Sequence, residues 1–525
     1  MRRRALAAAS ILVLGLTACT YGAGGNKRSD KPTFRPVYKA ADCPSAIALV
    51  VVTKVSCGKL TVLAHHAHPD GGKLDLFVAR MEPPTSRPAR DPVLSLGGDL
   101  GTAPDYVTLG AQIKGLGREV IVLDARGTGR SGPSLACQEV EALPHAHLEV
   151  RVDDPRTRTE FLDALEACHD RLVTRGVDLS AFGLREMAAD AEDLRVALGI
   201  DGWNVMALGT TSRIALEYLR DFPRHIRAAV LDSPDWPGVD PLIESVEATR
   251  HAISELGAAC SADAACRSFT PDFADDVRKV IEKLDAEPFV AHYGNRETVF
   301  FDAGWFLTWL RARLSFIRPP GTFVPHAVAE FARGSEKVLR LEASRLGPRQ
   351  RPVGRSFVCH RFLPNCWTHL GRSFGVYLSV MCHDVVPFTN HSSLTDLVGG
   401  DAGFQEAFGG SPFLDACGAW NVGRGDLATA TPVRADVPAL VIVGRFDPFG
   451  MAPYAQKGLT SLSNGHLVIS PVNGHQVTGT EQELPNLCMV RIRDTWLDDP
   501  TRQPDTSCAE AARVDYALPL GWKLD

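Results

Sequence analysis

The segment from Trp203 to Asp232 constrains the fold of this chain more than any other. It opens with the apolar run Trp203–Met206, a predicted buried strand, and continues after a short turn into the predicted helix Arg213–Leu219. A second apolar strand is expected at Ala228–Asp232. Two strands joined by a helix form a βαβ unit, and such units build largely parallel sheets.

Similar apolar runs occur on both sides of this unit. The other predicted strands are Ile47–Val55, Lys59–Ala64, Leu74–Ala79, Pro92–Leu96, Glu119–Leu123, Pro438–Val443 and His466–Ser470. A hairpin turn is expected at Pro69–Gly72, and the predicted helix Leu184–Leu198 has Gly199 as its C-cap. From about Trp236 to Ala430 the alternation stops, and helices such as Phe273–Leu284 and Val324–Ser344 are expected instead. Such an insertion between sheet strands is typical of a lid over a site.

The turn after Met206 has the spacing of a nucleophile elbow but lacks the nucleophile. In α/β-hydrolases, G-x-S-x-G lies on a sharp strand-to-helix turn that lifts the serine above the sheet. The positions two before and two after the serine must be small, and here they are Ala207 and Thr211. The serine's position falls on Gly209. We therefore expect hydrolysis to be lost or strongly reduced.

The other parts of a hydrolase site follow in the expected chain order of nucleophile, acid and histidine. Asp447 comes just after one predicted strand, and His475 lies on the loop after the next. The acid would hold the imidazole, which would take the nucleophile's proton. The backbone N–H of Thr210 and the glycine turn Gly97–Gly98 are the expected oxyanion hole.

An unconventional nucleophile remains an alternative. Thr210 and Ser212 both lie in the turn. A nucleophile at Ser212 would bring the bulky Ile214 to a position that must be small, and threonine tolerates a strained backbone poorly. With either residue as nucleophile, the chain would be an active peptidase or esterase.

The first residues are predicted to direct export. Residues 1–18 have a basic start and a short apolar stretch, which is typical of a signal peptide. Leu16-Thr17-Ala18-Cys19 resembles a bacterial lipobox, so Cys19 is the expected lipidation site, and residues 19–40 form a predicted tether. We expect a protein anchored to the outer face of the membrane or, if the signal is cut elsewhere, secreted.

The cysteines fit an oxidising compartment. Thirteen are present, and removing Cys19 leaves an even number. Local spacing suggests the pairs Cys43–Cys57, Cys137–Cys168, Cys260–Cys266, Cys359–Cys366, Cys382–Cys417 and Cys488–Cys508. A structural zinc site is disfavoured because no C-x-x-C pair occurs. With a net charge of −6, the chain lacks the basic excess that nucleic-acid binding needs.

Two further motifs allow alternative interpretations. His65, His66 and His68 precede the hairpin turn, but without an acidic or thiol partner nearby in the sequence an exposed loop is favoured over a metal site. The run 127–132 matches G-x-G-x-x-G after a strand. Because no evident helix opens after it, a dinucleotide site is disfavoured.

The chain resembles a known family over about Cys43 to Cys508. The residues that carry the resemblance are Gly97-Gly98, 124–131, Cys137, Trp203-Asn204, 213–219, 417–420, Asp447-Pro448 and Gly474-His475. They are similar to those of the secreted tripeptidyl-aminopeptidase-like α/β-hydrolases of actinobacteria, relatives of proline iminopeptidases. The resemblance implies an α/β-hydrolase fold, cleavage of short peptides from free N-termini or of esters, and no cofactor.

The chain departs from that family at three elements of the site. Gly209 replaces the serine, Gly98-Asp99-Leu100-Gly101 replaces a glycine-proline-glycine loop, and 449–453 differs after the acid. We expect a hydrolase core at 41–235 and 431–525 with a lid at 236–430, and a peptide or small acyl compound as ligand. The sequence does not indicate an oligomeric state.

Overall fold

The computed structural model describes residues 34–48, 54–83, 85, 88–101, 115–141, 143, 154–293, 297–317, 321–337, 340, 373–409, 413–479 and 486–516. The predicted signal peptide, Cys19, Cys359 and Cys366 lie outside the described residues. Contacts divide the chain into units 1–35 and 36–525, and the fold below is that of the second unit.

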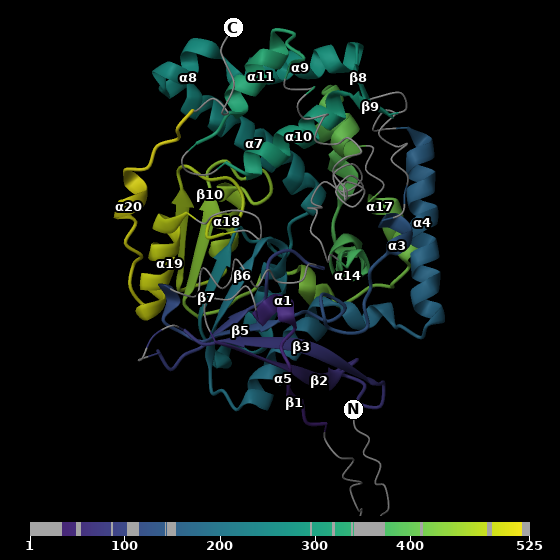
Figure 1. Cartoon of the computed structure of the whole chain (residues 1–525), viewed down its shortest axis with the longest axis vertical. Coiled ribbons are helices and arrows are strands. Elements are labelled where there is room, and N and C mark those ends of the chain that lie inside the picture. Colours follow the sequence, from purple (N-terminus) through teal and green to yellow (C-terminus); the bar gives the residue numbers. More distant parts are fainter. Residues whose placement is uncertain are drawn as a thin grey trace, which may run out of the picture. The chain divides into compact units, whose positions relative to one another are not determined.

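Nine described strands form one sheet in the order β1-β2-β3-β5-β4-β6-β7-β10-β11 (Figure 1). They are β1 Val37–Ala41, β2 Val55–Leu63, β3 Lys73–Met81, β4 Val93–Ser95, β5 Val120–Leu123, β6 Trp203–Leu208, β7 Ile226–Asp232, β10 Ala439–Gly444 and β11 Gly465–Ser470. Pairing is antiparallel from β1 through β3 to β5 and parallel from β5 to β11. This is the expected mostly parallel sheet.

The central strands are apolar on both sides. Successive side chains of a strand point to opposite faces of the sheet. Val205 of β6 and Val441 of β10 belong to one hydrophobic core, whereas Met206 and Leu440 belong to another. Both faces of the sheet are therefore covered, as parallel sheets require.

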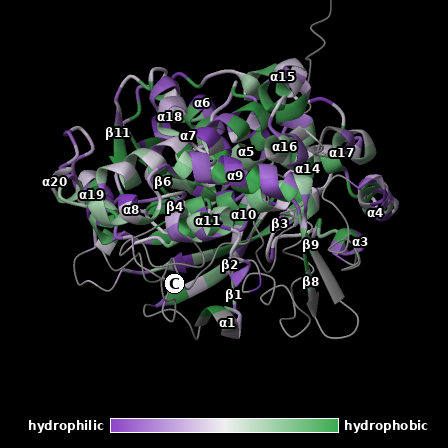
Figure 2. Cartoon of the chain, turned by 90° about the horizontal axis from the view of Figure 1, so that it is seen from above, coloured by the Kyte–Doolittle hydropathy of each residue, from purple (hydrophilic) through white to green (hydrophobic). Residues whose placement is uncertain are grey.

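Helices pack on this sheet and extend beyond it. They are α1 Ser45–Ala48, α3 Gln138–Glu141, α4 Pro155–Thr174, α5 Leu184–Leu198, α6 Ser212–Asp221, α7 Pro241–Ala262, α8 Ala264–Phe269, α9 Phe273–Ala286, α10 Ala303–Ser315, α11 Val324–Ala332, α14 Phe374–Val380, α15 Leu394–Val398, α16 Ala402–Phe404, α17 Phe413–Trp420, α18 Ala452–Leu459, α19 Leu487–Asp498 and α20 Ser507–Glu510. Helix α9 carries both apolar and polar residues (Figure 2), and its apolar residues, such as Phe273 and Ile281, are buried. In the described part of the chain, no helix is long and apolar enough to cross a membrane.

The described residues between β7 and β10 add no strand to the large sheet, although these two strands are neighbours in it. The described helices of this segment are α7, α8, α9, α10, α11, α14, α15, α16 and α17, and it also has a separate hairpin of β8 Phe289–Tyr293 and β9 Glu297–Phe301. Helices α7, α9, α10 and α11 gather beyond the ends of β7 and β10 (Figure 1). The carbonyl of Ser315, at the end of α10, accepts a hydrogen bond from the backbone N–H of His475 at 2.9 Å.

Three predicted elements differ from the structure. Strand β1 begins at Val37, inside the predicted tether, because it pairs antiparallel with β2. Ile47, predicted to open a strand, is a buried residue of helix α1, and β2 begins only at Val55. Helix α11 ends at Ala332 instead of continuing toward Ser344, since a turn follows in which Gly334 has φ +91°. The hairpin and α5 agree with the prediction, and Gly199 adopts the left-handed cap conformation.

Candidate active site

Gly209 follows the last residue of β6 directly and begins the turn into α6. Its φ is +55°, a conformation that non-glycine residues adopt only at a cost of about 1–2 kcal/mol. A β-carbon built on Gly209 would lie 3.5 Å from Nε2 of His475. Gly209 therefore gives the strand-to-helix turn the positive φ that a nucleophile elbow requires, and it has no side chain.

Asp447 and His475 lie next to each other, as their predicted roles require. Nδ1 of His475 is 2.9 Å and 3.0 Å from the two carboxylate oxygens of Asp447. Asp447 is fully buried and also accepts hydrogen bonds from the backbone N–H groups of Phe449 and Gly450. These contacts fix the carboxylate and the ring that it holds.

The charges of this pair shift both pKa values. Burial acts to raise the pKa of Asp447, but the charge and hydrogen bond of His475 outweigh it and lower the pKa. Burial acts to lower the pKa of His475, but the charge and hydrogen bond of Asp447, and then Asp99 and Asp232, outweigh it and raise the pKa. The carboxylate of Asp447 therefore stabilises the protonated form of the His475 ring, which is the form that a general base takes up when it accepts a proton.

The predicted oxyanion loop is fastened to the turn through Thr211. The backbone N–H of Thr211 donates to the carbonyl of Gly98 at 3.3 Å, and its hydroxyl donates to the carbonyl of Gly97 at 3.1 Å. Thr210 lines the pocket, and its hydroxyl accepts a hydrogen bond from the N–H of Leu100 at 2.8 Å. The three predicted residues therefore lie beside Gly209.

Asp99 brings a carboxylate to the place where a nucleophile side chain would begin. Its Oδ1 lies 2.7 Å from a β-carbon built on Gly209. The hydroxyl of Thr210 donates to this oxygen at 3.3 Å, and the side-chain amide of Gln476 does so at 3.5 Å. A carboxylate here opposes the negative charge that develops during acyl transfer.

The two alternative nucleophiles have different surroundings. Ser212 is fully buried; its hydroxyl donates to the carbonyl of Gly209 at 2.6 Å and accepts from the N–H of Asp235 at 2.8 Å. Ser212 thus links the turn to the segment after β7 and does not line the pocket. Thr210, in contrast to Ser212, lines the pocket.

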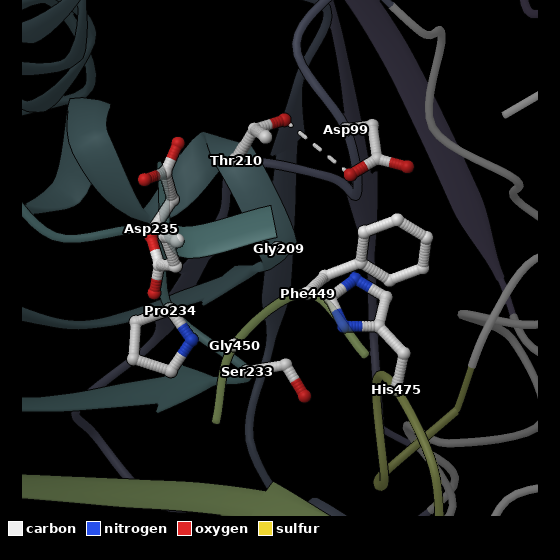
Figure 3. A pocket seen from close by; sticks show the side chains of 10 residues that line it. Asp99, Gly209, Thr210, Ser233, Pro234, Asp235, Phe449, Gly450 and His475 are labelled. Atoms are coloured by element: carbon white, nitrogen blue, oxygen red, sulfur yellow. Dashed lines mark hydrogen bonds between the residues drawn. The ribbon is translucent and has the colours of Figure 1, made fainter. Parts of the chain in front are cut away.

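The pocket contains residues that sequence reasoning missed. The pocket is shown in Figure 3. The missed lining residues are Ser233, Pro234, Asp235 and Glu244, and Phe449 and Gly450 were noted only as a departure from the family. Ser233 to Asp235 come directly after β7, and the ends of parallel strands next to a candidate site were the available signal.

Asp235 is held by a buried ion pair. Both of its carboxylate oxygens are 2.7 Å from the guanidinium of Arg213, which is 1% exposed. Ser233 has φ +51°, and its hydroxyl accepts from the N–H of Gln476 at 2.9 Å. These contacts connect α6, the end of β7 and the histidine loop around the pocket.

The prediction of an exposed histidine loop is corrected. His66 is partly buried, with Nδ1 2.5 Å from Glu186 and Nε2 3.2 Å from Asp193, both on α5. His65 lies 2.9 Å from Asp178, while His68 is exposed. Acidic side chains that are far away in the sequence therefore hold the histidine loop against helix α5. Within the described ranges, no group of three or more His, Cys, Asp or Glu side chains is arranged to hold a metal.

The glycine run 127–132 forms a packed turn. The hydroxyl of Ser131 accepts from the N–H of Phe77 and donates to the carbonyl of Asp124. A β-carbon on Gly127 would lie 2.6 Å from Val376, so this glycine allows close packing. The next helix, α3, begins only at Gln138.

Five of the six predicted disulfides are formed. They are Cys43–Cys57, Cys137–Cys168, Cys260–Cys266, Cys382–Cys417 and Cys488–Cys508. The pair Cys359–Cys366 falls outside the described residues. Disulfides in this number are typical of proteins that fold in an oxidising, extracytoplasmic compartment.

Comparisons with known proteins agree with this architecture. Residues 92–254 match the family described as alpha/beta hydrolase fold, and residues 406–508 match that described as TAP-like protein. The serine protease Hip1 of Mycobacterium bovis and that of Mycobacterium tuberculosis are each 27% identical over 278 residues, covering 50% of this chain and 52% of the relative. The chain thus spans about half the length of the curated relatives it matches.

Solved structures were compared as well. A serine hydrolase from Cycloclasticus zankles is 14% identical, covers 84% of this chain and 98% of its own, and has a TM-score of 0.34. An esterase from Thermogutta terrifontis is also 14% identical, with 82% and 96% covered and a TM-score of 0.34.

The sheet, the elbow geometry and the matched segment around them define the class: the chain has the α/β-hydrolase fold. Its C-terminal match and its likeness to Hip1 add that it is a hydrolase-fold protein related to the TAP-like peptidases and esterases.

Proposed function

We propose that this chain is an exported α/β-hydrolase-fold protein whose hydrolase activity is lost or strongly reduced, and that its pocket binds peptides or acyl compounds. One observation carries the proposal: the backbone at Gly209 has φ +55°, and its missing β-carbon would lie 3.5 Å from Nε2 of His475. The site thus has an acid–histidine pair beside an elbow without a hydroxyl. Such a scaffold retains binding and, at most, residual catalysis.

The test compares the natural protein with Gly209→Ser on aminoacyl and tripeptidyl anilides and short-chain esters. We expect little or no turnover by the natural protein and measurable turnover by Gly209→Ser, because removing the serine from a triad costs roughly 10⁶ in turnover. Gly209→Ala is the matched control, since it adds the same β-carbon without a hydroxyl. A natural protein that is already fast, and that stays fast after His475→Ala, would contradict the proposal.

An active enzyme with another nucleophile is the second candidate. It is favoured by the hydroxyls of Thr210 and Ser233, which line the pocket with His475. A fluorophosphonate probe distinguishes the two candidates, because it labels an activated hydroxyl. We expect label on Gly209→Ser and none on the natural protein; label on Thr210 or Ser233 of the natural protein would establish the second candidate.

Anchoring through Cys19 is a further part of the proposal. It is supported by the lipobox-like run Leu16–Cys19 and by the disulfides of the folded unit. Stable attachment requires more than one acyl chain. Cys19→Ser should release the protein to the medium or stall its processing, as followed by fractionation of cells. Natural protein found wholly in the medium would contradict the anchor.

A further inference from the structure

Three polar side chains from separate parts of the chain converge beside the α-carbon of Gly209. A β-carbon built there would lie 2.7 Å from Oδ1 of Asp99, 2.7 Å from Nε2 of Gln476 and 3.5 Å from Nε2 of His475. Asp99, Gly209 and His475 also line the pocket, where the first and last carry the polar side chains around the turn (Figure 3). The space in front of Gly209 is therefore polar and continuous with the pocket.

The chemistry of these three side chains suits a water molecule. The carboxylate of Asp99 can accept one proton of the water, and the imidazole of His475 can accept the other. The side-chain amide of Gln476 can donate to the water oxygen. An ordered water typically makes about three hydrogen bonds, and these groups supply that number. In a conventional triad the serine hydroxyl occupies the corresponding space beside the imidazole.

We infer that this chain hydrolyses activated esters slowly, by direct attack of a water held between Asp99, Gln476 and His475, without an acyl-enzyme intermediate. The inference rests on the proposed function, because it names the route of the residual catalysis that the proposed function allows. It requires no side chain at position 209, and it differs in this respect from a triad that contains a serine.

The reaction needs no further reactant. The oxygen of the water forms a bond to the carbonyl carbon of the ester, while one proton of the water passes to Nε2 of His475. The electron pair of the carbonyl bond moves to the carbonyl oxygen and then returns as the bond to the leaving group breaks. The leaving group departs with that bond's electron pair and takes the proton from His475. The products are a carboxylic acid and an alcohol or phenol.

The same residues limit the rate and the substrates. General-base help from His475 is worth roughly 10²–10⁴-fold, whereas removal of a triad serine costs roughly 10⁶ in turnover. The carboxylate of Asp99 holds the water but also opposes negative charge on the carbonyl oxygen. We therefore expect hydrolysis of aryl esters, whose leaving groups depart easily, and none of anilides.

The rate should depend on the protonation of His475. The charged or titratable groups on the elements around it are Asp99, Asp232, Asp235, Glu244, Arg311 and Asp447. Burial acts to lower the pKa of His475, but the charge and hydrogen bond of Asp447 outweigh it. The charges of Asp99 and Asp232 add to this, so the pKa lies above its usual value of 6.5. Because only the neutral ring accepts a proton, the rate should rise with pH through this pKa and then level off.

The experiment measures hydrolysis of p-nitrophenyl acetate by the natural full-length protein at pH 8. We expect a rate above that of the buffer that falls roughly tenfold or more in His475→Gln. His169→Gln is the matched control and should keep the rate, since His169 lies on α4 beside Asp170 and does not line the pocket. Protein quenched during turnover should show no acetylated species by mass spectrometry. An equal rate in His475→Gln, or an acetyl group on Thr210 or Ser233, would overturn the inference.

Variants at the turn locate the water. Gly209→Ala places a methyl group against Asp99 and Gln476 and should lower the rate roughly tenfold, because it displaces the water. Alanine is strained at φ +55°, so Asp99→Ala is a second variant that removes an acceptor without adding strain. It should also lower the rate, although the same change should raise the activity of Gly209→Ser. A rate that stays the same in both variants, or that rises in Asp99→Ala alone, overturns the inference.

The outcome is separable from that of the proposed function. If hydrolysis of the ester does not depend on His475 while N-acetyl-alanine amide, a neutral acyl probe, still binds in a calorimetric titration, the water route fails and the binding function stands. If the natural protein is as fast as Gly209→Ser and a fluorophosphonate labels it, the proposed loss of hydrolysis fails as well.

Discussion

The carboxylate of Asp99 stands 2.7 Å from the point where a β-carbon on Gly209 would lie. The turn thus has no side chain at the predicted nucleophile position and has a carboxylate beside that position. In acyl transfer at this site, the first feature would leave no attacking atom and the second would oppose the developing oxyanion.

This relationship predicts that one substitution will restore activity only in part. A serine at position 209 must either displace the carboxylate of Asp99 or react next to its negative charge. The double variant Gly209→Ser/Asp99→Ala should therefore have a kcat roughly tenfold or more above that of Gly209→Ser. This factor corresponds to about 1.4 kcal/mol in the activation free energy. Asp99→Ala alone should stay inactive, as measured by release of a chromophore from tripeptidyl anilides. If the double and single variants are equally active, Asp99 does not oppose the reaction.

Because of the imidazole of His66, the free energy of unfolding should fall as the pH rises into the alkaline range. Burial acts to lower its pKa, but hydrogen bonds to Asp193 and Glu186 outweigh it and raise the pKa from 6.5 to about 9. Glu186, Asp190 and Asp193 all face the ring. Because the folded pKa lies above the unfolded value, the stabilisation is complete below about pH 6.5 and disappears as pH rises through about 9.

His66→Gln should remove that contribution, which is at most about 3 kcal/mol in the free energy of unfolding. Urea unfolding at pH 6 and pH 9.5 measures it: the natural protein should lose its advantage over the variant between these values. A constant difference at both pH values would show that the ring is not charged in the folded protein.

Breaking the ion pair between Asp235 and Arg213 should destabilise the fold strongly. Asp235→Ala leaves the guanidinium of Arg213 buried and unpaired, which typically costs about 3–5 kcal/mol. Asp221→Ala is the control, because Asp221 lies 3.6 Å from the half-exposed Arg185, and such a pair contributes less than about 1 kcal/mol. Denaturant unfolding of both variants checks this, and a similar small loss in each would contradict it.

No free thiol should remain in the chain once Cys19 is set aside. Five disulfides are formed among the described residues, which leaves Cys359 and Cys366 for the sixth predicted pair. Thiol titration of denatured, unreduced Cys19→Ser protein should therefore read near zero, and the same sample after reduction should read twelve. Two titratable thiols before reduction would mean that Cys359 and Cys366 are unpaired.

The sequence was most informative where structure depends on local pattern. Strands β6 and β7 and helix α6 could be predicted because hydrophobic periodicity and the small residues of the turn lie within one short stretch. Asp447 and His475 could be placed near each other because both follow neighbouring parallel strands. Five disulfides could be predicted for a similar reason, because each joins two cysteines that are close in the sequence.

The rest depends on contacts between distant parts of the chain. The acids that hold His66 are more than one hundred residues away, so the loop seemed to have no partners. Glu244 is an acidic residue in an amphipathic helix, a pattern that normally indicates a solvent-exposed side chain. Asp99 could be expected near the site because it belongs to the predicted oxyanion loop, but its 2.7 Å distance from a β-carbon on Gly209 depends on how that loop packs on the turn.

The neighbouring positions of β7 and β10 also set an order of assembly. Strand β7 ends at Asp232 and β10 begins at Ala439. When the two strands pair, they close a loop of about two hundred residues, at an entropic cost of roughly 5 kcal/mol. During synthesis the elbow emerges long before Asp447 and His475, since domains form from the N-terminus onward. The Asp447–His475 pair is therefore added last, and a truncated chain would present the turn without its acid and histidine.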